Sequence, residues 1–440
     1  MSGGSAWAGA AAAVATAGYA LCSRRLTTTP ITSAMLFTGI GLLIGPLALG
    51  LIDLAHDAGP VLALVEATLT VVLFTDAMTV RRSDLRTEGF VPLRLLTIGL
   101  LLTIGAGWLL AWPLLPGLTV WELALVGVIL APTDAALGKT SIADPRVPRL
   151  VRHGLKVESG LNDGMVLPFF VLFLAGVPGT AAAEEGAAGT FWRALVLSTA
   201  IGAAVGLVGG TLLPRAQAAR WATTGWAQVF ILAVAAAAYF PAVAVDGSGF
   251  IAAWVGGFAF AAAMRRTTPR DREPRPDPTA TAEFAERLGE LLTAVSFLVF
   301  GAVLLGPALQ DLTWRIVLYA LLSLTVVRII PVALSLLGTG LRLPTVLYAG
   351  WFGPRGLASI VFALLVVEEG VPGVELLGQV VAVTVGLSVL LHGLTAIPLA
   401  TRYSTWHAHT ARTTPTLREG APEPTPEQDD RPQRPHPADD

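Results

Sequence analysis

Long apolar segments alternate with short polar connections along most of the chain. About thirteen of these segments are long enough to cross a bilayer as helices, since a span needs about 20 apolar residues. They predict an all-α polytopic membrane protein with one transmembrane domain over residues 1–400. The predicted spans are 5–22, 31–52, 60–80, 91–115, 119–138, 157–176, 191–213, 225–241, 249–264, 287–309, 313–338, 345–367 and 374–400.

Connections rich in Arg or Lys alternate with connections that carry mainly Asp or Glu. The positive-inside rule places the basic connections in the cytoplasm. We therefore predict a multi-pass plasma-membrane protein with its N-terminus outside and its C-terminus in the cytoplasm. Arg24, Arg81, Lys139, Arg215 and Arg342 mark basic connections, and Asp57, Glu184, Asp246, Asp311 and Glu368 mark acidic ones.

The apolar pattern ends near residue 400. Residues 401–440 are polar and rich in Pro, so they cannot bury enough apolar surface to fold alone, and we predict a disordered cytoplasmic tail. Composition agrees with a membrane protein, because only 14% of residues are charged where a soluble domain has about a quarter. The single cysteine, Cys22, excludes an internal disulfide.

A group of polar residues begins the apolar run over 157–176. Ser159 and Asp163 share one helix face, and Glu158 and Asn162 share another, because residues four apart lie on the same side. A carboxylate within a membrane helix is costly and by default marks an ion or proton pathway. The oxygen ligands of the first face suit a small hard cation. We expect the second face to contact a neighbouring helix.

Two other spans contain helix breaks beside charged residues. Pro132 precedes Thr133 and Asp134 in the fifth span, and Pro354 precedes Arg355 in the twelfth. Proline interrupts a helix, and opened backbone in a membrane must line a cavity or pack within protein. A packing kink would explain either break alone. They lie seven spans apart in the chain, and an odd offset makes the two helices run in opposite directions. This matches two inverted repeats, spans one to six and eight to thirteen, joined by span seven.

Segments 131–138, 157–164 and 353–356 resemble motifs of sodium/proton exchangers, the cation:proton antiporter-1 branch of the monovalent cation:proton antiporter superfamily. Segments 37–46, 297–302 and 392–395 add to the resemblance, which covers about residues 5–400. It implies a thirteen-helix fold with two inverted six-helix repeats and crossing broken helices. It also implies a homodimer in membrane lipid that transports Na⁺ and H⁺ without a cofactor.

The resemblance also implies roles for residues of the fifth and sixth spans. Asp163 matches the carboxylate that binds either Na⁺ or a proton, and Thr133 and Ser159 match additional oxygen ligands. Asn162 matches a residue that hydrogen-bonds Asp134. Whether Asp134 caps a broken helix or binds the cation stays open. Many members have Asp-Pro in this span, whereas here proline comes two residues before Asp134.

Other charged residues have expected roles further from the cation. Glu158 and Arg328 match a buried, mainly structural ion pair between spans six and eleven. Asp76 roughly matches an acidic residue near the cation, and Arg355 is expected to be a charge of the broken helix. His392 is expected to be a packed intramembrane histidine and not a proton relay.

The predicted function is secondary antiport of Na⁺ for H⁺ by alternating access, with Li⁺ and K⁺ as alternative cations. A cation channel would need a filter, and no filter-like repeat occurs. A membrane-embedded hydrolase would need a Ser–His pair or a His-rich metal motif, and neither is found. Without a P-loop, nucleotide is not an expected partner, and nucleic acid is not one either. Because Asn162 cannot titrate, we expect electroneutral exchange, with the Asn162 amide holding Asp134 deprotonated.

Overall fold

The computed structural model describes residues 3–26, 29–50, 58–80, 90–134, 137, 144–180, 183, 186–267, 278–414 and 417–420. All regular structure in these residues is helical, which confirms the predicted fold class. Eight segments are long and apolar enough to cross a membrane by themselves. They contain α3 (Ala58–Thr79), α5–η1–α6 (Phe90–Arg94, Leu95–Gly99, Leu100–Leu114), α9 (Arg149–Gly176), α11 (Ala187–Ala218), α12 (Thr224–Ala244), α14–η2–α15 (Pro278–Phe300, Gly301–Leu305, Gly306–Ala308), α16–α17 (Trp314–Leu324, Val326–Ser335) and α20 (Val374–Thr413).

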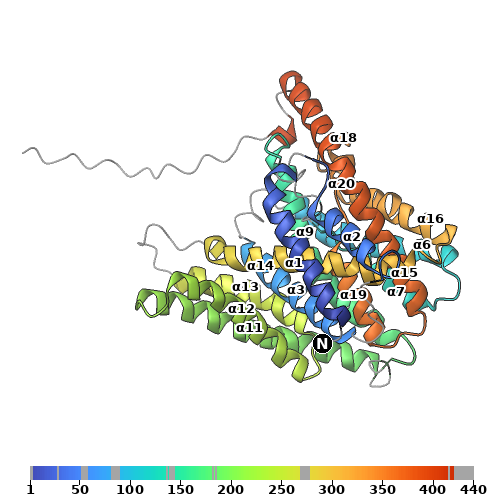
Figure 1. The fold of residues 1–440 in the computed structure, drawn as a ribbon. Helices are drawn as coiled ribbons and strands as arrows, with labels where there is room; N and C mark the ends of the chain where they lie inside the picture. The colour runs from blue at the N-terminus through green and yellow to red at the C-terminus, as the bar shows by residue number, and fades with distance from the viewer. Residues whose placement is uncertain are drawn as a thin grey trace, which may run out of the picture.

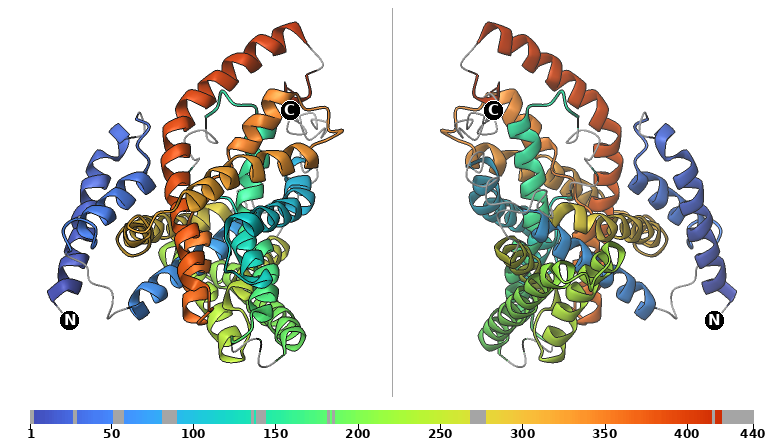
Figure 2. Two further views of the ribbon diagram at one scale, coloured as in Figure 1. Left: turned by 90° about the vertical axis from the view of Figure 1, so that its right-hand side faces the viewer. Right: turned by 90° about the vertical axis from the view of Figure 1, so that its left-hand side faces the viewer.

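The remaining predicted spans contain shorter or less apolar helices. α1 and α2 lie at one flank of the bundle (Figure 2). α7, α18 and α19 are the short pieces of the two broken spans. These helices are α1 (Gly3–Leu26), α2 (Ser33–Ile44), α7 (Val120–Ile129), α13 (Gly249–Thr267), α18 (Leu343–Trp351) and α19 (Leu357–Glu368), followed by the 3₁₀ turn η3 (Arg418–Gly420).

Threonines begin four of the helices. The side chain of each accepts a hydrogen bond from the backbone N–H three residues later, which satisfies one of the free donors of the first turn. The four pairs are Thr32 with Met35, Thr119 with Glu122, Thr223 with Trp226 and Thr313 with Ile316.

Several helix boundaries differ from the prediction, and two of them bear on the site. α9 begins at Arg149 and not near residue 157, because its first turns, although polar, pack against α5. α20 continues to Thr413, so the predicted start of a disordered tail at 401 is wrong. The extra turns carry Tyr403 and Trp406, which stack with Tyr348 of α18 in one aromatic row. Residues 421–440 lie outside the described part.

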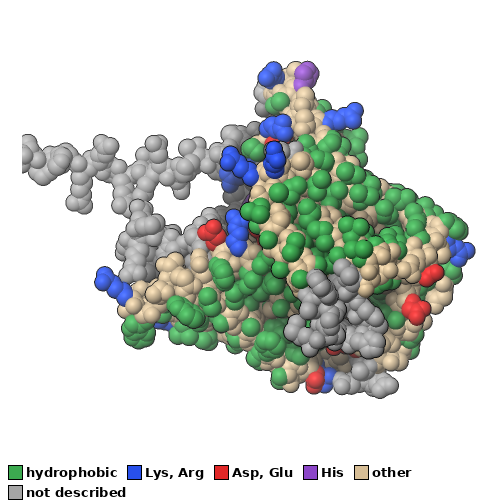
Figure 3. All heavy atoms as spheres, viewed as in Figure 1, with side chains coloured by type: hydrophobic (Ala, Val, Ile, Leu, Met, Phe, Trp, Pro, Cys, Tyr) green, Lys and Arg blue, Asp and Glu red, His purple; other side chains and the backbone are tan. Residues whose placement is uncertain are grey.

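The two ends of the bundle differ in charge. α9 begins and α20 ends at one end, which we call the basic end, at the top of Figure 1. Figure 3 shows most Lys and Arg side chains of this face in its upper part, above a broad apolar surface. Exposed large apolar side chains such as Trp226, Phe240 and Leu109 cover the sides of the bundle, as expected for contact with lipid tails.

α11 and α13 pack along each other almost backbone to backbone. Three glycines of α11 lie directly against carbonyl groups of α13, and a Cβ at any of them would overlap with a backbone oxygen. Small residues four apart allow this close approach between membrane helices. The contacts are Gly202 with Ala252, Gly206 with Gly256, and Gly210 with Phe260.

Candidate functional site

The two predicted breaks lie against each other in the middle of the bundle. α7 ends at Ile129 and α18 at Trp351, and each is followed by non-helical backbone. The Asp134 N–H donates to the Pro354 carbonyl over 2.8 Å, so the two non-helical segments are joined directly. We call this arrangement, residues 130–134 with 352–356, the crossing.

Side chains replace the backbone hydrogen bonds that the breaks remove. The Leu357 N–H at the start of α19 donates to Asp134 Oδ2 over 3.2 Å. Ser359 of α19 donates to the Ile129 carbonyl at the end of α7 over 2.7 Å. A Cβ at Gly356 would overlap with the Asp134 carboxylate, so only glycine leaves room for this contact. Helix ends buried in a membrane need such partners.

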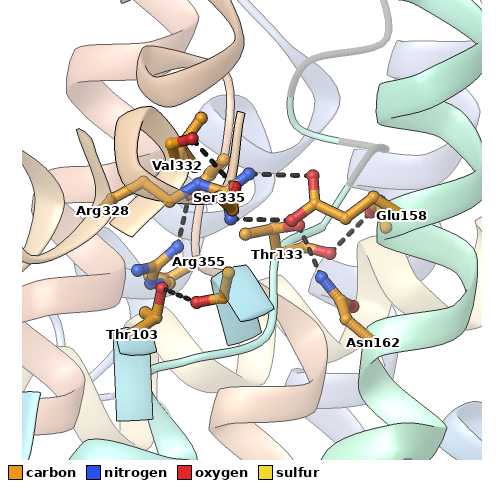
Figure 4. Close-up of polar contacts among 11 residues, drawn as sticks. Thr103, Thr133, Glu158, Asn162, Arg328, Val332, Ser335 and Arg355 are labelled. Atoms are coloured by element: carbon orange, nitrogen blue, oxygen red, sulfur yellow. Dashed lines mark hydrogen bonds and ion pairs between the residues drawn. The ribbon is translucent and has the colours of Figure 1, made fainter. Parts of the chain in front are cut away.

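α9 places its polar face against the crossing. Ser159 donates to the Thr133 carbonyl over 2.6 Å, and Asn162 Nδ2 donates to Thr133 Oγ1 over 2.7 Å (Figure 4). The Asn162 amide thus bonds Thr133, and its expected bond to Asp134 stays a prediction. The Asp134 carboxylate accepts from the first N–H of α19.

Asp163 and Asp76 lie on the more open side of this arrangement. Both side chains are partly exposed, whereas Ser159 and Asn162 are buried. Asp163 Oδ1 has no hydrogen-bond partner among the described residues. Asp76 of α3 lies against Gly160, with its Cβ 3.6 Å from where a Gly160 Cβ would be. The carboxylates of Asp76, Asp134 and Asp163 are close enough to repel one another.

A tryptophan from another helix closes one side of the Asp163 turn. Trp254 of α13 lies flat on Gly164, the residue after Asp163, where a Cβ would overlap with the indole ring. Its indole N–H is buried and has no hydrogen-bond partner among the residues that the structure describes. The residue pattern gave no signal for this contact, because Trp254 lies in an ordinary apolar run.

A second charged layer lies behind the crossing. Arg328 of α17 holds Glu158 of α9 with both terminal nitrogens, at 2.7 and 2.8 Å, and both side chains are 3% exposed. Gly353 lies against the Arg328 side chain, so the pair also touches the second break. The structure thus brings together the two residues that the resemblance pairs.

Arg355 is fully buried and is held by the break itself. Its backbone N–H donates to Ser388 Oγ over 2.6 Å, and its side-chain Nη1 donates to the Gly353 carbonyl over 2.7 Å. His392 lies nearby, with Nε2 2.9 Å from the carbonyl of Trp351, the last residue of α18, and its ring stacks on that indole. His392 thus sits where it can stabilise a helix end, as a packed histidine would. Sequence reasoning missed Ser359 and Ser388, since a lone serine in an apolar run carries no signal.

The fold and the crossing can now be compared with known proteins. Residues 11–402 match the family model described as "Sodium/hydrogen exchanger, transmembrane". The chain belongs to the sodium/hydrogen exchanger family. Members of this family are ion transporters that need no cofactor, and they are not enzymes. The chain is therefore a multi-pass membrane protein of a transporter family.

Similar proteins include curated relatives and a solved structure. A K⁺/H⁺ antiporter NhaP of Alkalimonas amylolytica is 28% identical over 379 residues, covering 83% of this chain and 61% of that protein. A K⁺/H⁺ antiporter NhaP2 of Shewanella sp. (strain MR-4) is 25% identical over 365 residues, covering 82% and 60%. The chain thus spans about three fifths of the length of these relatives. The sodium proton antiporter MjNhaP1 from Methanocaldococcus jannaschii shares the fold, with a TM-score of 0.71 at 20% identity over 91% of this chain and 98% of that one.

Proposed function

We propose that this chain exchanges a monovalent cation for a proton by alternating access around the crossing. One observation carries the proposal. Asp163 is a partly exposed carboxylate within a membrane helix, and one of its oxygens has no hydrogen-bond partner among the described residues. Such a group is costly in a membrane unless it serves an ion or proton pathway.

Proton and cation would compete for the Asp163 carboxylate. A bound proton neutralises the carboxylate and a bound cation needs it ionised, so binding of one opposes binding of the other. Ser159 donates its hydroxyl hydrogen to the Thr133 carbonyl, and its oxygen is a candidate ligand for the cation. Thr133 Oγ1 is fixed by the Asn162 amide and supplies another oxygen. Each half-cycle would then carry either the cation or the proton.

Na⁺ and K⁺ are both candidate substrates, with Li⁺ as a further alternative. The donor set of hydroxyl and carboxylate oxygens suits hard cations in general. The curated relatives are named K⁺/H⁺ antiporters, and the protein of similar fold is named a sodium proton antiporter. Both K⁺ and Na⁺ are therefore tested as substrates.

We infer that exchange is electroneutral, one cation for one proton. Asn162, next to Asp163, cannot titrate, so it cannot carry a second proton. Asp134 accepts from the Leu357 N–H at the start of α19, where the helix dipole favours negative charge. Asp134 should therefore stay ionised through the cycle.

We also propose a membrane orientation and an assembly. The positive-inside rule places the basic end in the cytoplasm and the N-terminus outside, in the plasma membrane. A homodimer is expected for this family.

Proteoliposomes test the function directly. An outward proton gradient is imposed, and internal pH is followed after separate additions of Na⁺, K⁺ and Li⁺. The proposal predicts saturable, cation-dependent proton movement that stays unchanged when K⁺ and valinomycin clamp the membrane potential. For the Na⁺ arm, a reversal point that shifts with the clamped potential would refute electroneutrality. Cation flux without coupled proton movement would indicate a channel instead.

A further inference from the structure

The segment 417–419, which follows α20, supplies a carboxylate to the first turn of α18. Glu419 is only 3% exposed, and its Oε1 accepts from the Arg342 backbone N–H and from the Thr345 hydroxyl, both over 2.8 Å. Arg342 is the N-cap of α18 and its own side chain makes no capping bond. The helix is thus capped from outside by a residue more than seventy positions later in the chain.

α7, the matching half-helix of the other broken span, has its carboxylate within the helix. Glu122 is the third residue of α7, and its Oε2 accepts from the N–H of the N-cap Thr119 over 2.6 Å. The third residue of α18 is Thr345, which cannot make this bond. Glu419 therefore makes for α18 the hydrogen bond that Glu122 makes for α7. Each broken span begins with a carboxylate on its N-cap N–H.

Several other contacts hold the segment 417–419 in place. Leu417 is buried, and Arg418 Nη1 donates to the Thr339 carbonyl. The Arg418 guanidinium lies over the Phe90 ring at 4.6 Å from its centroid. The Thr345 hydroxyl also lies 3.0 Å from that of Tyr403 on α20. Packing, cation–π and hydrogen-bond contacts therefore fix the carboxylate at α18.

The other end of α18 leads into the crossing. α18 has 9 residues, so its first turn lies only about 14 Å from the break at a rise of 1.5 Å per residue. So short a helix is marginal by itself and depends on its caps and packing. Loosening its first turn would therefore reach Gly353, Pro354 and Arg355.

We infer that Glu419 is a positioning residue for exchange, which acts through α18 on the crossing. The inference rests on the proposed function. Without the cap, the crossing is correctly arranged for a smaller fraction of the time. The apparent affinity for the cation falls by that fraction.

Hydrogen–deuterium exchange and transport of full-length Glu419→Ala test this inference together. Losing an N-cap typically speeds hydrogen–deuterium exchange of the amides in the first turn by roughly 2- to 30-fold. We expect such an increase over residues 343–348, and a several-fold rise in the half-saturating cation concentration per folded molecule. Glu419→Gln keeps an acceptor oxygen and should lie between Glu419→Ala and wild type. Glu283→Ala, which removes an exposed glutamate of α14, is the matched control.

A double variant separates capping from general damage. Glu419→Ala with Thr345→Glu places the carboxylate at the third residue of α18, as in α7. If this restores both protection of the first turn and the cation half-saturation, the inference is supported. It is overturned if protection returns while half-saturation stays raised, or if Glu419→Ala changes neither quantity. Should wild type transport no cation at all, the proposed function fails, and the hydrogen–deuterium exchange still reports on the cap.

Discussion

Two of the direct backbone contacts in this bundle are made by different means. α11 and α13 make contact as continuous helices, with glycines of one against carbonyls of the other. The crossing makes contact with interrupted helices, joined by a hydrogen bond from Asp134 to Pro354. In each case a glycine lies where a Cβ would not fit, as at Gly206 in α11 and at Gly356 in the crossing.

The two contacts differ in whether they leave backbone N–H and carbonyl groups without a partner in their own helix. Continuous helices satisfy their own backbone groups, so the α11–α13 contact needs only small residues. The breaks release N–H and carbonyl groups, and Asp134, Ser359 and Ser388 bind them. Polar side chains are therefore gathered at the crossing for structural reasons, and Asp163 lies beside them. We infer that the first contact is a scaffold and the second a site.

The largest loss of stability is expected from splitting the buried ion pair behind the crossing. Arg328→Ala leaves the Glu158 carboxylate buried without its partner, which typically costs about 3–5 kcal/mol. Thermal unfolding in detergent should show a clear fall for either single variant. Exchanging the two charges, Glu158→Arg with Arg328→Glu, should recover part of it. A single variant as stable as wild type would show that the pair contributes little.

Adding one methyl group at each of the two close contacts tests whether only the crossing is needed for transport. Gly206→Ala and Gly356→Ala both create overlap, and overpacking typically costs about 1–3 kcal/mol. Both variants should unfold at lower temperature. Only Gly356→Ala should also lose most exchange per folded molecule, because it displaces Asp134. Equal transport by the two variants in proteoliposomes would contradict the distinction between scaffold and site.

A smaller effect is expected from Asn162→Ala. This change removes the donor to Thr133 Oγ1 and leaves a buried hydroxyl less well satisfied, which typically costs about 1–3 kcal/mol. We expect weaker cation binding, seen as a higher half-saturating concentration in the transport assay, with unchanged electroneutrality. A variant that transported net charge would show that Asn162 controls the protonation of Asp134 after all.

The smallest effect is expected outside the membrane spans, at the exposed pair of Asp144 and Arg146. The Arg146 side chain donates to Asp144 over 2.7 Å and holds the pKa of that carboxyl below its usual range. A lowered folded-state pKa stabilises above the unfolded pKa, and that contribution is lost as pH falls through the folded value. Asp144→Asn should therefore change the unfolding temperature little at neutral pH, and still less in acid. A large shift would mean that this turn supports α9.

Apolar periodicity sufficed to predict the helices because each span must satisfy its backbone within itself. Pro132 and Pro354 likewise marked both breaks, since proline cannot continue a helix. Side-chain partners across the bundle could not be predicted from pattern alone. Asn162 turned out to bond Thr133, and Trp254 covers Gly164 from a helix with no polar signal. The role of Glu419 was also hidden, because its segment has the composition of an unfolded tail and its contact with α18 joins residues far apart in the sequence.

The central claim is that Asp163 carries both the cation and the proton. Asp163→Asn keeps the shape of the side chain but can neither titrate nor carry charge. In proteoliposomes loaded with equal amounts of folded protein, the account predicts that this variant shows no Na⁺- or K⁺-dependent proton flux while unfolding at the wild-type temperature or above. Substantial cation-dependent proton flux through Asp163→Asn would contradict the account.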